Sequence, residues 1–172
     1  RWNKEIAFVY NKEILQKLSN IIPQSTAISI QEALYSGDSE NLQKCLRKLL
    51  LESVSVFDTA YENFYHGLVL GLCAMLDNRY EVTSNREAGE GRYDICLIPR
   101  QKRLPGILIE LKACKDCKEE ELKSLAKEAL NQIDQKLYDR AFANGKASHI
   151  VKYGVAFSGK KVEIETESSI TD

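Results

Sequence analysis

Three features of the sequence predict an α/β fold. Apolar residues recur at helical spacing over residues 58–78, and three short β-branched segments follow between residues 79 and 113. A long amphipathic segment, residues 117–145, then precedes two more strand-like segments in residues 149–167. From Asp58 onward, the predicted order of elements is therefore α-β-β-β-α-β-β.

Composition places the chain among ordinary globular proteins. It has 172 residues, 44% of them apolar and 28% charged, which suits one domain with its own core. The net charge of −1 removes the strongly basic surface that often marks nucleic-acid binding, so any such site must be a local patch. No apolar run approaches the roughly 20 residues that span a bilayer, and no signal-peptide pattern is present. We expect a cytoplasmic protein, and the opening RWNKEIAF, without Met, suggests a fragment of a longer chain.

Residues 1–57 are predicted to form small helices. A first helical pattern stops at Pro23, a second ends at Gly37, and Asp38 or Ser39 is the expected N-cap of a third. We expect these residues to form a helical cap, residues 58–167 the main domain and residues 168–172 a tail.

The helix predicted over residues 58–78 has a continuous apolar face and Asp58 as its N-cap. Gly67 and Gly71 lie four residues apart, and each costs about 1 kcal/mol against alanine in a helix. That cost predicts a close approach to another backbone, such as a sheet. Glu62 and His66 border the apolar face, where they could be functional or simply boundary residues.

Residues 92–98 and 107–113 are predicted to pair as a hairpin with a basic tip. Because strand residues two apart share a face, Glu110 and Lys112 point the same way. If paired residue numbers sum to about 205, Asp94 lies opposite residue 111, beside Glu110 and Lys112. Two carboxylates and one ammonium then converge on one place.

This convergence has a chemical interpretation. Neighbouring carboxylates repel unless a proton or a cation separates them, and Mg²⁺ takes one or two carboxylates together with waters and substrate phosphate. The backbone carbonyl of Leu111 could add a ligand, and Lys112 could orient or deprotonate water or stabilise phosphate charge. The alternative is a solvated hairpin face on which Asp94 and Lys112 form a surface ion pair.

The segment 117–145 is predicted to be one long helix, with acidic residues at its start and Gly145 beyond its end. Its apolar stripe comprises Leu122, Leu125, Ala126, Ala129, Ile133 and Leu137. The two strands that follow are predicted to be joined by Ser158 and Gly159.

The five cysteines are odd in number and scattered through apolar segments, which predicts reduced thiols. Cys114 and Cys117 form a CxxC motif. A zinc site would need two more ligands, and the only histidines, His66 and His149, have no zinc-finger spacing. Incidental thiols are therefore favoured over zinc binding or redox chemistry.

The segment GRYDICLIPRQKRLPGILIELKA resembles the PD-(D/E)XK nuclease superfamily, with Asp94 as its Asp and Glu110-Leu111-Lys112 as its E-x-K. More narrowly, the chain looks like the nuclease-like domain that follows a AAA-type ATPase domain in many bacterial proteins. YENFYHGLVLGL, SNREAGEGRYDI, EALNQIDQKLYDRAFANG and KYGVAFSGKKVEI carry that narrower resemblance, over roughly residues 58–165. WNKEIAFVYNKEIL resembles the segment that leaves the ATPase module.

The resemblance implies roles for individual residues. It makes Asp94 and Glu110 metal ligands and Lys112 the catalytic lysine, with Glu62 reaching the metal or its water from the first helix. Gln132 matches a polar position on the second helix.

Two positions depart from the pattern. Related nucleases often place a Tyr four residues after that Gln, whereas here the residue is Lys136 and the tyrosine is Tyr138. Tyr93 stands where the superfamily motif has Pro. Substrate contacts are expected from Arg92, Lys115, Lys136 and Tyr138.

The resemblance also implies a restriction-endonuclease-like α/β fold, a mixed sheet with an antiparallel meander between two helices. It implies a Mg²⁺- or Mn²⁺-dependent nuclease whose substrate is nucleic acid, with DNA favoured over RNA. An ATPase domain is the expected neighbour in the full-length chain. The alternative is a non-catalytic nuclease-like module that binds or regulates that ATPase domain.

Overall fold

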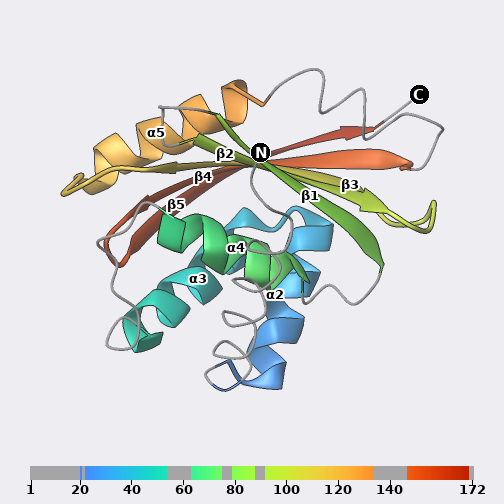
Figure 1. Cartoon of the computed structure of the whole chain (residues 1–172), viewed down its shortest axis with the longest axis horizontal. Helices are drawn as coiled ribbons and strands as arrows, with labels where there is room; N and C mark the ends of the chain where they lie inside the picture. The colour runs from blue at the N-terminus through green and yellow to red at the C-terminus, as the bar shows by residue number, and fades with distance from the viewer. Residues whose placement is uncertain are drawn as a thin grey trace.

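A computed structural model describes residues 20, 22–53, 63–74, 79–87, 92–133 and 147–170. Within these residues a mixed sheet separates two layers of helices (Figure 1). The helices are α2 (Gln24–Ser36), α3 (Ser39–Ser53), α4 (Asn63–Ala74) and α5 (Glu119–Asn131). The strands are β1 (Tyr80–Glu87), β2 (Arg92–Pro99), β3 (Gly106–Ala113), β4 (His149–Ser158) and β5 (Lys161–Ile170).

The sheet confirms the predicted order of elements. Its strands run β1-β2-β3-β4-β5 in space, and neighbours are antiparallel except for β3 and β4, which are parallel. A parallel pair needs a long crossover, and α5 lies in that connection. The α/β fold with an antiparallel meander, β1 to β3, is the one that the sequence predicts. β5 continues to Ile170, three residues past the predicted boundary at 167.

The register of the β2–β3 hairpin differs from the prediction by one residue. Asp94 pairs with Glu110 and Tyr93 pairs with Leu111, so paired numbers sum to 204 rather than 205. The difference matters because a one-residue shift moves a side chain to the other face of the sheet. In the observed register Asp94 lies on the same face as Glu110, directly opposite it.

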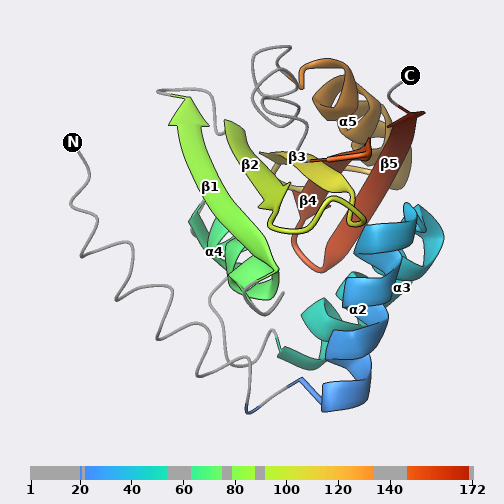
Figure 2. The ribbon, with the colours of Figure 1, turned by 90° about the vertical axis from the view of Figure 1, so that its right-hand side faces the viewer.

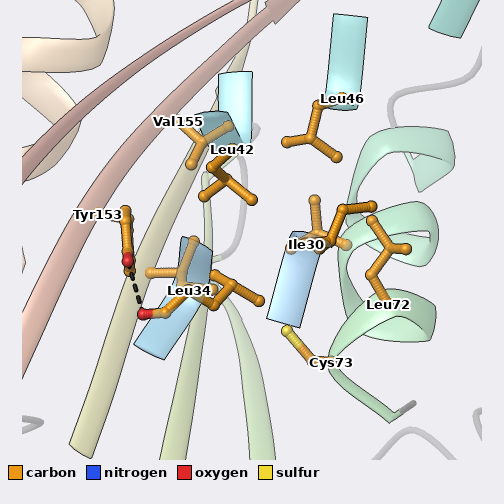
Figure 3. Close-up of a pocket in the computed structure, with 10 residues that line it drawn as sticks. Ile30, Leu34, Leu42, Leu46, Leu72, Cys73, Tyr153 and Val155 are labelled. Carbon is orange, nitrogen blue, oxygen red and sulfur yellow. Dashed lines mark hydrogen bonds between the residues drawn. The ribbon is translucent and has the colours of Figure 1, made fainter. Parts of the chain in front are cut away.

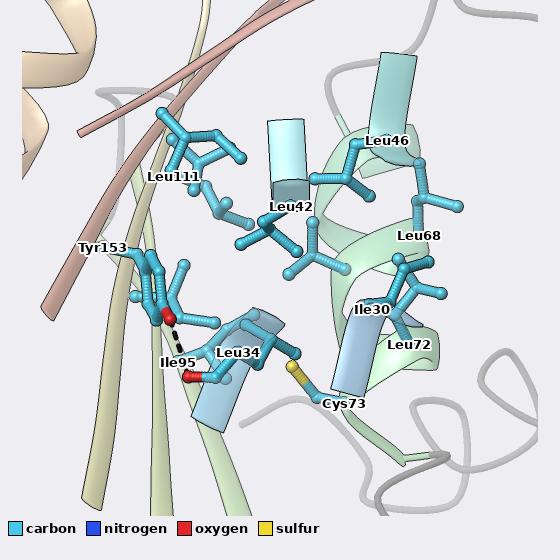
Figure 4. Packing of buried hydrophobic residues seen from close by; sticks show 14 of the residues in the cluster. Ile30, Leu34, Leu42, Leu46, Leu68, Leu72, Cys73, Ile95, Leu111 and Tyr153 are labelled. Carbon is cyan, nitrogen blue, oxygen red and sulfur yellow. Dashed lines mark hydrogen bonds between the residues drawn. The ribbon is translucent and has the colours of Figure 1, made fainter. Parts of the chain in front are cut away.

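One face of the sheet is covered by α2, α3 and α4, and the other by α5 (Figures 1 and 2). The larger core lies on the first face, where Ile95, Leu111 and Tyr153 from the sheet meet residues such as Leu34 and Leu72 from the helices (Figure 4). The predicted second and third helices are thus confirmed as α2 and α3. The pattern predicted before Pro23 falls almost wholly on residues outside the described ranges.

Helix α2 is tied to the sheet through its carboxyl end. The hydroxyl of Tyr153, on β4, donates to the carbonyls of Leu34 (2.6 Å) and Ala33 (3.1 Å) in the last turn of the helix. Burial raises the pKa of Tyr153, which keeps the hydroxyl a donor. Gly37 ends the helix at φ 71°, as the sequence predicts.

Helix α3 is held against the edge strand β5. The Arg47 guanidinium lies 2.6 Å from the buried carboxylate of Glu163, and the backbone N–H of Ile164 donates to Gln43 (2.9 Å). Asp38 caps α3 by accepting from the backbone N–H of Asn41 (3.1 Å), as predicted. These contacts show which surface the N-terminal helices cover.

Helix α5 packs closely on the opposite face. A Cβ added at Gly154, on β4, would lie well inside van der Waals contact with the Ala126 carbonyl oxygen and 2.9 Å from the Leu130 Cβ. Leu122, Ala126 and Ala156 form a small buried cluster beside this contact. The absence of a side chain at Gly154 therefore sets how close α5 comes to the sheet.

The length of α5 differs from the prediction, and the predicted length of α4 can be checked only in part. α5 ends at Asn131 with Gln132 as its cap, whereas the sequence predicts one helix from 117 to 145. Its last turn tightens, because the N–H groups of Gln132 and Ile133 bond to carbonyls three residues back. Residues 134–146 lie outside the described ranges, as do 58–62 and 75–78 around α4.

In the described part of the chain, no helix has the length and apolar character needed to span a membrane.

Candidate functional site

Two carboxylates lie side by side on neighbouring strands. Asp94 of β2 and Glu110 of β3 are direct cross-strand partners, a placement that leaves Cβ atoms about 4.5–5.5 Å apart. Glu110 is only 2% exposed and Asp94 is half-buried. Like charges placed this way destabilise a sheet unless a cation or proton lies between them. The pair therefore forms a place with affinity for positive charge.

Lys112 adds the third charge. It follows Glu110 by two residues on β3 and so lies on the same face. Its side chain is 11% exposed, and its Nζ lies 3.0 Å from Oε1 of Glu128 on α5. The predicted ion pair of Lys112 with Asp94 at a solvated surface is thus replaced by a pair with Glu128.

Glu128 also connects Lys112 to Gln132. The Gln132 amide Nε2 donates to the same Glu128 oxygen, Oε1, at 3.3 Å. This places predicted site residues from β3 and α5 in one polar network, with Glu128 at its centre. Sequence reasoning missed Glu128, although its position one helical turn before Gln132 was a usable signal.

The structure describes the other predicted site residues only in part. Lys115 is exposed in the loop after β3, three residues beyond Lys112. The Leu111 side chain faces the opposite, apolar core, so only its backbone could serve as a ligand. Arg92 begins β2, but only its backbone is described. Glu62, Lys136 and Tyr138 lie outside the described residues, and their roles stay predictions.

His66 has a structural contact. Its Nε2 lies at hydrogen-bond distance from the Ser84 hydroxyl on β1. The contact joins α4 to the sheet on the face opposite Asp94 and Glu110, because Ser84 pairs with Ile95. The contact with Ser84 suits a boundary residue, and a functional role for His66 stays a prediction.

The carboxylates have the chemistry of a hard-cation site. Mg²⁺ takes oxygen ligands, is often held by only one or two carboxylates, and completes its shell with waters and substrate phosphate. Asp94 and Glu110 supply two carboxylates. No group of three or more His, Cys, Asp or Glu among the described residues could hold a metal. The donor set therefore fits an ion that keeps several non-protein ligands.

Two hollows formed by described residues lie away from the carboxylates. A cavity of about 20 Å³ sits between the sheet and α2, α3 and α4, lined by apolar residues including Ile30, Leu46 and Leu72 (Figure 3). It is too small for an organic ligand and has an apolar lining, so it is a packing defect of the core. A groove of about 450 Å³ runs along α2 and α3, where the hydroxyls of Ser29 and Ser36 bond to carbonyls of their own helix.

The CxxC motif is oxidised in this structure, contrary to the prediction of reduced thiols. A disulfide joins Cys114 and Cys117 in the loop between β3 and α5, and Cys45, Cys73 and Cys96 are thiols. The loop is held to the end of β4, because Cys114 N–H donates to the Phe157 carbonyl (2.9 Å). Two cysteines three residues apart can meet when the loop between them makes one turn. The scattered positions of the five cysteines in the sequence do not reveal this pairing.

Alkylation of the unreduced, denatured protein is expected to modify three cysteines, and five after reduction with dithiothreitol. The physical reason is that a disulfide sulfur is not a nucleophile toward iodoacetamide, whereas a thiolate is. Intact mass measures the number of adducts. A Cys117→Ser variant should show four adducts without reduction, because Cys114 is released. Five adducts on the unreduced wild type would show that the pair is reduced.

Comparison with known proteins agrees with the geometry. Residues 60–167, more than half of the 172-residue chain, match the family described as the PD-(D/E)XK nuclease superfamily. No curated protein matches the chain. The matched region contains β2 and β3 with Asp94, Glu110 and Lys112, and it extends through α5 to most of β5. A mixed sheet flanked by helices, with the D…ExK residues together on one face, accompanies this match, and the chain belongs to the PD-(D/E)XK nuclease superfamily.

Proposed function

We propose that this protein hydrolyses phosphodiester bonds of nucleic acid, with DNA favoured over RNA, in a reaction that requires Mg²⁺ or Mn²⁺. The observation that carries the proposal is the direct pairing of Asp94 with Glu110, with Lys112 on the same face of the sheet. Superfamily membership supports a nuclease-like function, and members generally use divalent metals. A bound divalent ion would polarise the phosphate and lower the pKa of a water.

Each residue has a distinct task in this proposal. Asp94 and Glu110 would hold the ion through carboxylate oxygens, and Asp94, unlike the buried Glu110, keeps some exposure to solvent. The Lys112 ammonium orients the attacking water and stabilises charge that develops on the phosphate oxygens. The water oxygen bonds to phosphorus and gives its proton to solvent, while the bond to the leaving ester oxygen breaks and that oxygen takes a proton from solvent.

Substrate contacts are proposed for Arg92, Lys115, Lys136 and Tyr138. Lys115 is exposed just past the end of β3, and Arg92 starts β2 two residues before Asp94. Lys136 and Tyr138 complete the proposed set. Local charge of this kind is what a chain with net charge −1 must use to hold a polyanion.

The direct test is cleavage of single- and double-stranded DNA and RNA in Mg²⁺, in Mn²⁺ and in EDTA, with Asp94→Ala as the matched inactive variant. Cleavage that requires metal and Asp94 supports the proposal. Absence of cleavage on every substrate would instead favour a binding module that regulates an attached ATPase domain.

Divalent metal is expected to raise the melting temperature of the wild type by about 3–6 °C at a concentration tenfold above its Kd. Binding to the folded state alone stabilises it by about 1.4 kcal/mol under that condition, and 1 kcal/mol shifts a domain of this size by about 2–4 °C. Differential scanning fluorimetry with and without Mg²⁺ measures the shift.

Asp94→Asn is the matched variant for this measurement. It should lose the metal-dependent gain, and it should melt at or above the wild-type temperature in EDTA, because the repulsion with Glu110 is relieved. An equal shift in both proteins would place the metal elsewhere.

A further inference from the structure

The Lys112–Glu128 pair joins the carboxylate face of the sheet to α5. Nζ of Lys112 lies 3.0 Å from Oε1 of Glu128, and the lysine side chain is 11% exposed whereas the glutamate side chain is 55% exposed. A lysine ammonium removed this far from water requires an anionic or hydrogen-bonding partner. Glu128 supplies that partner from the solvent side.

We propose that Glu128 is a positioning residue that draws the Lys112 ammonium toward α5 and keeps it off the Asp94–Glu110 pair. This inference rests on the proposed function and adds a residue to it. Lys112 is two residues from Glu110 on the same face, so its ammonium has three carboxylates as candidate partners. An ammonium that neutralised Asp94 and Glu110 would compete with a divalent cation for the same oxygens.

The backbone places Glu128 beside the site. Gly154 of β4 is the register partner of Glu110, and the missing Cβ of Gly154 would point between Ala126 and Leu130 of α5. Glu128 is two residues from each of them, so it projects from the side of α5 that faces away from Gly154, which agrees with its 55% exposed side chain. Because α5 lies so close to the sheet, the long Lys112 side chain still reaches from β3 to Glu128 (3.0 Å).

Gln132 fixes the orientation of the Glu128 carboxylate. Its Nε2 donates at 3.3 Å to the oxygen that also faces Lys112, so one oxygen receives both contacts. Gln132 caps α5 and is set by the end of the helix. Gln132 thus orients Glu128, and Glu128 positions Lys112. The lysine is therefore positioned by residues of α5 rather than by residues of its own strand.

Oε1 of Glu128 faces the Lys112 ammonium, so we assign Glu128 a role exerted through Lys112 rather than through the metal.

The test compares Glu128→Gln with wild type in steady-state cleavage and in metal-dependent melting. We expect kcat to fall and the Mg²⁺ concentration for half-maximal stabilisation to rise, each by about 10- to 100-fold, with KM within about twofold. Glu128→Asp, which keeps the charge, should retain more activity than Glu128→Gln. Gln132→Ala should move both readouts in the same direction by a smaller factor.

Glu120→Gln is the matched control, because Glu120 is exposed in the first turn of the same helix and loses the same charge. It should leave kcat and the Mg²⁺ dependence unchanged. In EDTA the Glu128 variants should melt close to wild type, because the Glu128 side chain is 55% exposed and Lys112 can turn to Asp94 and Glu110 instead. An unchanged melting temperature in EDTA separates a positioning role from loss of fold.

The outcomes distinguish the two proposals. An active wild type with a Glu128→Gln variant equal to it in kcat and Mg²⁺ dependence overturns the positioning role alone. A variant faster than wild type also overturns it, because the pair would then restrain Lys112 in an inactive state. A wild type that cleaves no substrate overturns the nuclease proposal and removes the basis for this one.

Discussion

Replacing Lys112 with alanine is expected to reduce cleavage by about 10²- to 10⁴-fold, the range for loss of a group that transfers or stabilises charge in a transition state. The fold should survive, because the Glu128 carboxylate left behind is 55% exposed and can be hydrated. The metal-dependent gain in melting temperature should also survive, since Asp94 and Glu110 are unchanged. Single-turnover cleavage and scanning fluorimetry on the same preparation measure the two effects.

Lys112→Arg is the informative companion. It keeps a positive charge, yet a planar guanidinium is larger than an ammonium and distributes its donors in a fixed fork. At a side chain that is 11% exposed, that shape does not reproduce the single 3.0 Å contact with Glu128. We expect it to fail in catalysis, whereas Lys127→Arg, at an exposed position on α5, should be neutral. Full turnover by Lys112→Ala or by Lys112→Arg would remove Lys112 from the mechanism.

Gly154→Ala is expected to cause the largest loss of stability from a single added methyl group. The new Cβ would overlap the backbone of α5 at Ala126 and lie 2.9 Å from the Leu130 Cβ, and helix backbone cannot rotate away as a side chain can. Overpacking costs about 1–3 kcal/mol and occasionally more, and we expect the upper end. That corresponds to a fall in melting temperature of about 6–12 °C for a domain of this size.

Gly159→Ala is the control for that substitution. Nothing lies within 4 Å of its added Cβ, but its φ of 59° is left-handed, so a cost of about 1 kcal/mol is expected from backbone strain alone. We expect the wild type to be the most stable, Gly159→Ala to be less stable, and Gly154→Ala to be the least stable. If Gly154→Ala melted with the wild type, α5 would not approach β4 as closely as described. Any Gly154→Ala protein that folds should also show weakened cleavage, because α5 carries Glu128.

Much of the fold was predictable because its signals are local. Helical periodicity, β-branched segments and the turn at Ser158 and Gly159 gave the order of elements from α4 to β5, and Gly37 and Asp38 marked the α2–α3 junction correctly. Asp94, Glu110 and Lys112 could be grouped because strand alternation and one hairpin relate them. Each of these inferences depends on residues near one another in the sequence.

The register of the hairpin could not be fixed in the same way. Ile95 and Leu97 are buried on one face of β2, and Cys96 and Ile98 are buried on the other. A strand covered on both faces has no alternation of polar and apolar residues. Its sequence pattern therefore does not distinguish the observed pairing, in which paired residue numbers sum to 204, from the predicted pairing, in which they sum to 205. Only the observed pairing places Asp94 opposite Glu110.

By itself, then, the sequence determined the α/β order and the three charged residues of the D…ExK motif. The tertiary structure alone decided that α2 and α3 share the face of α4, that Gly154 admits α5, and that Glu128 rather than Asp94 pairs with Lys112. Glu128 is one of several glutamates on an amphipathic helix, and its position one turn before Gln132 associates it with Gln132 but does not identify Lys112 as its partner. Its partner is 16 residues away on another element, and such contacts depend on how closely a helix packs on a sheet, a distance that no local pattern encodes.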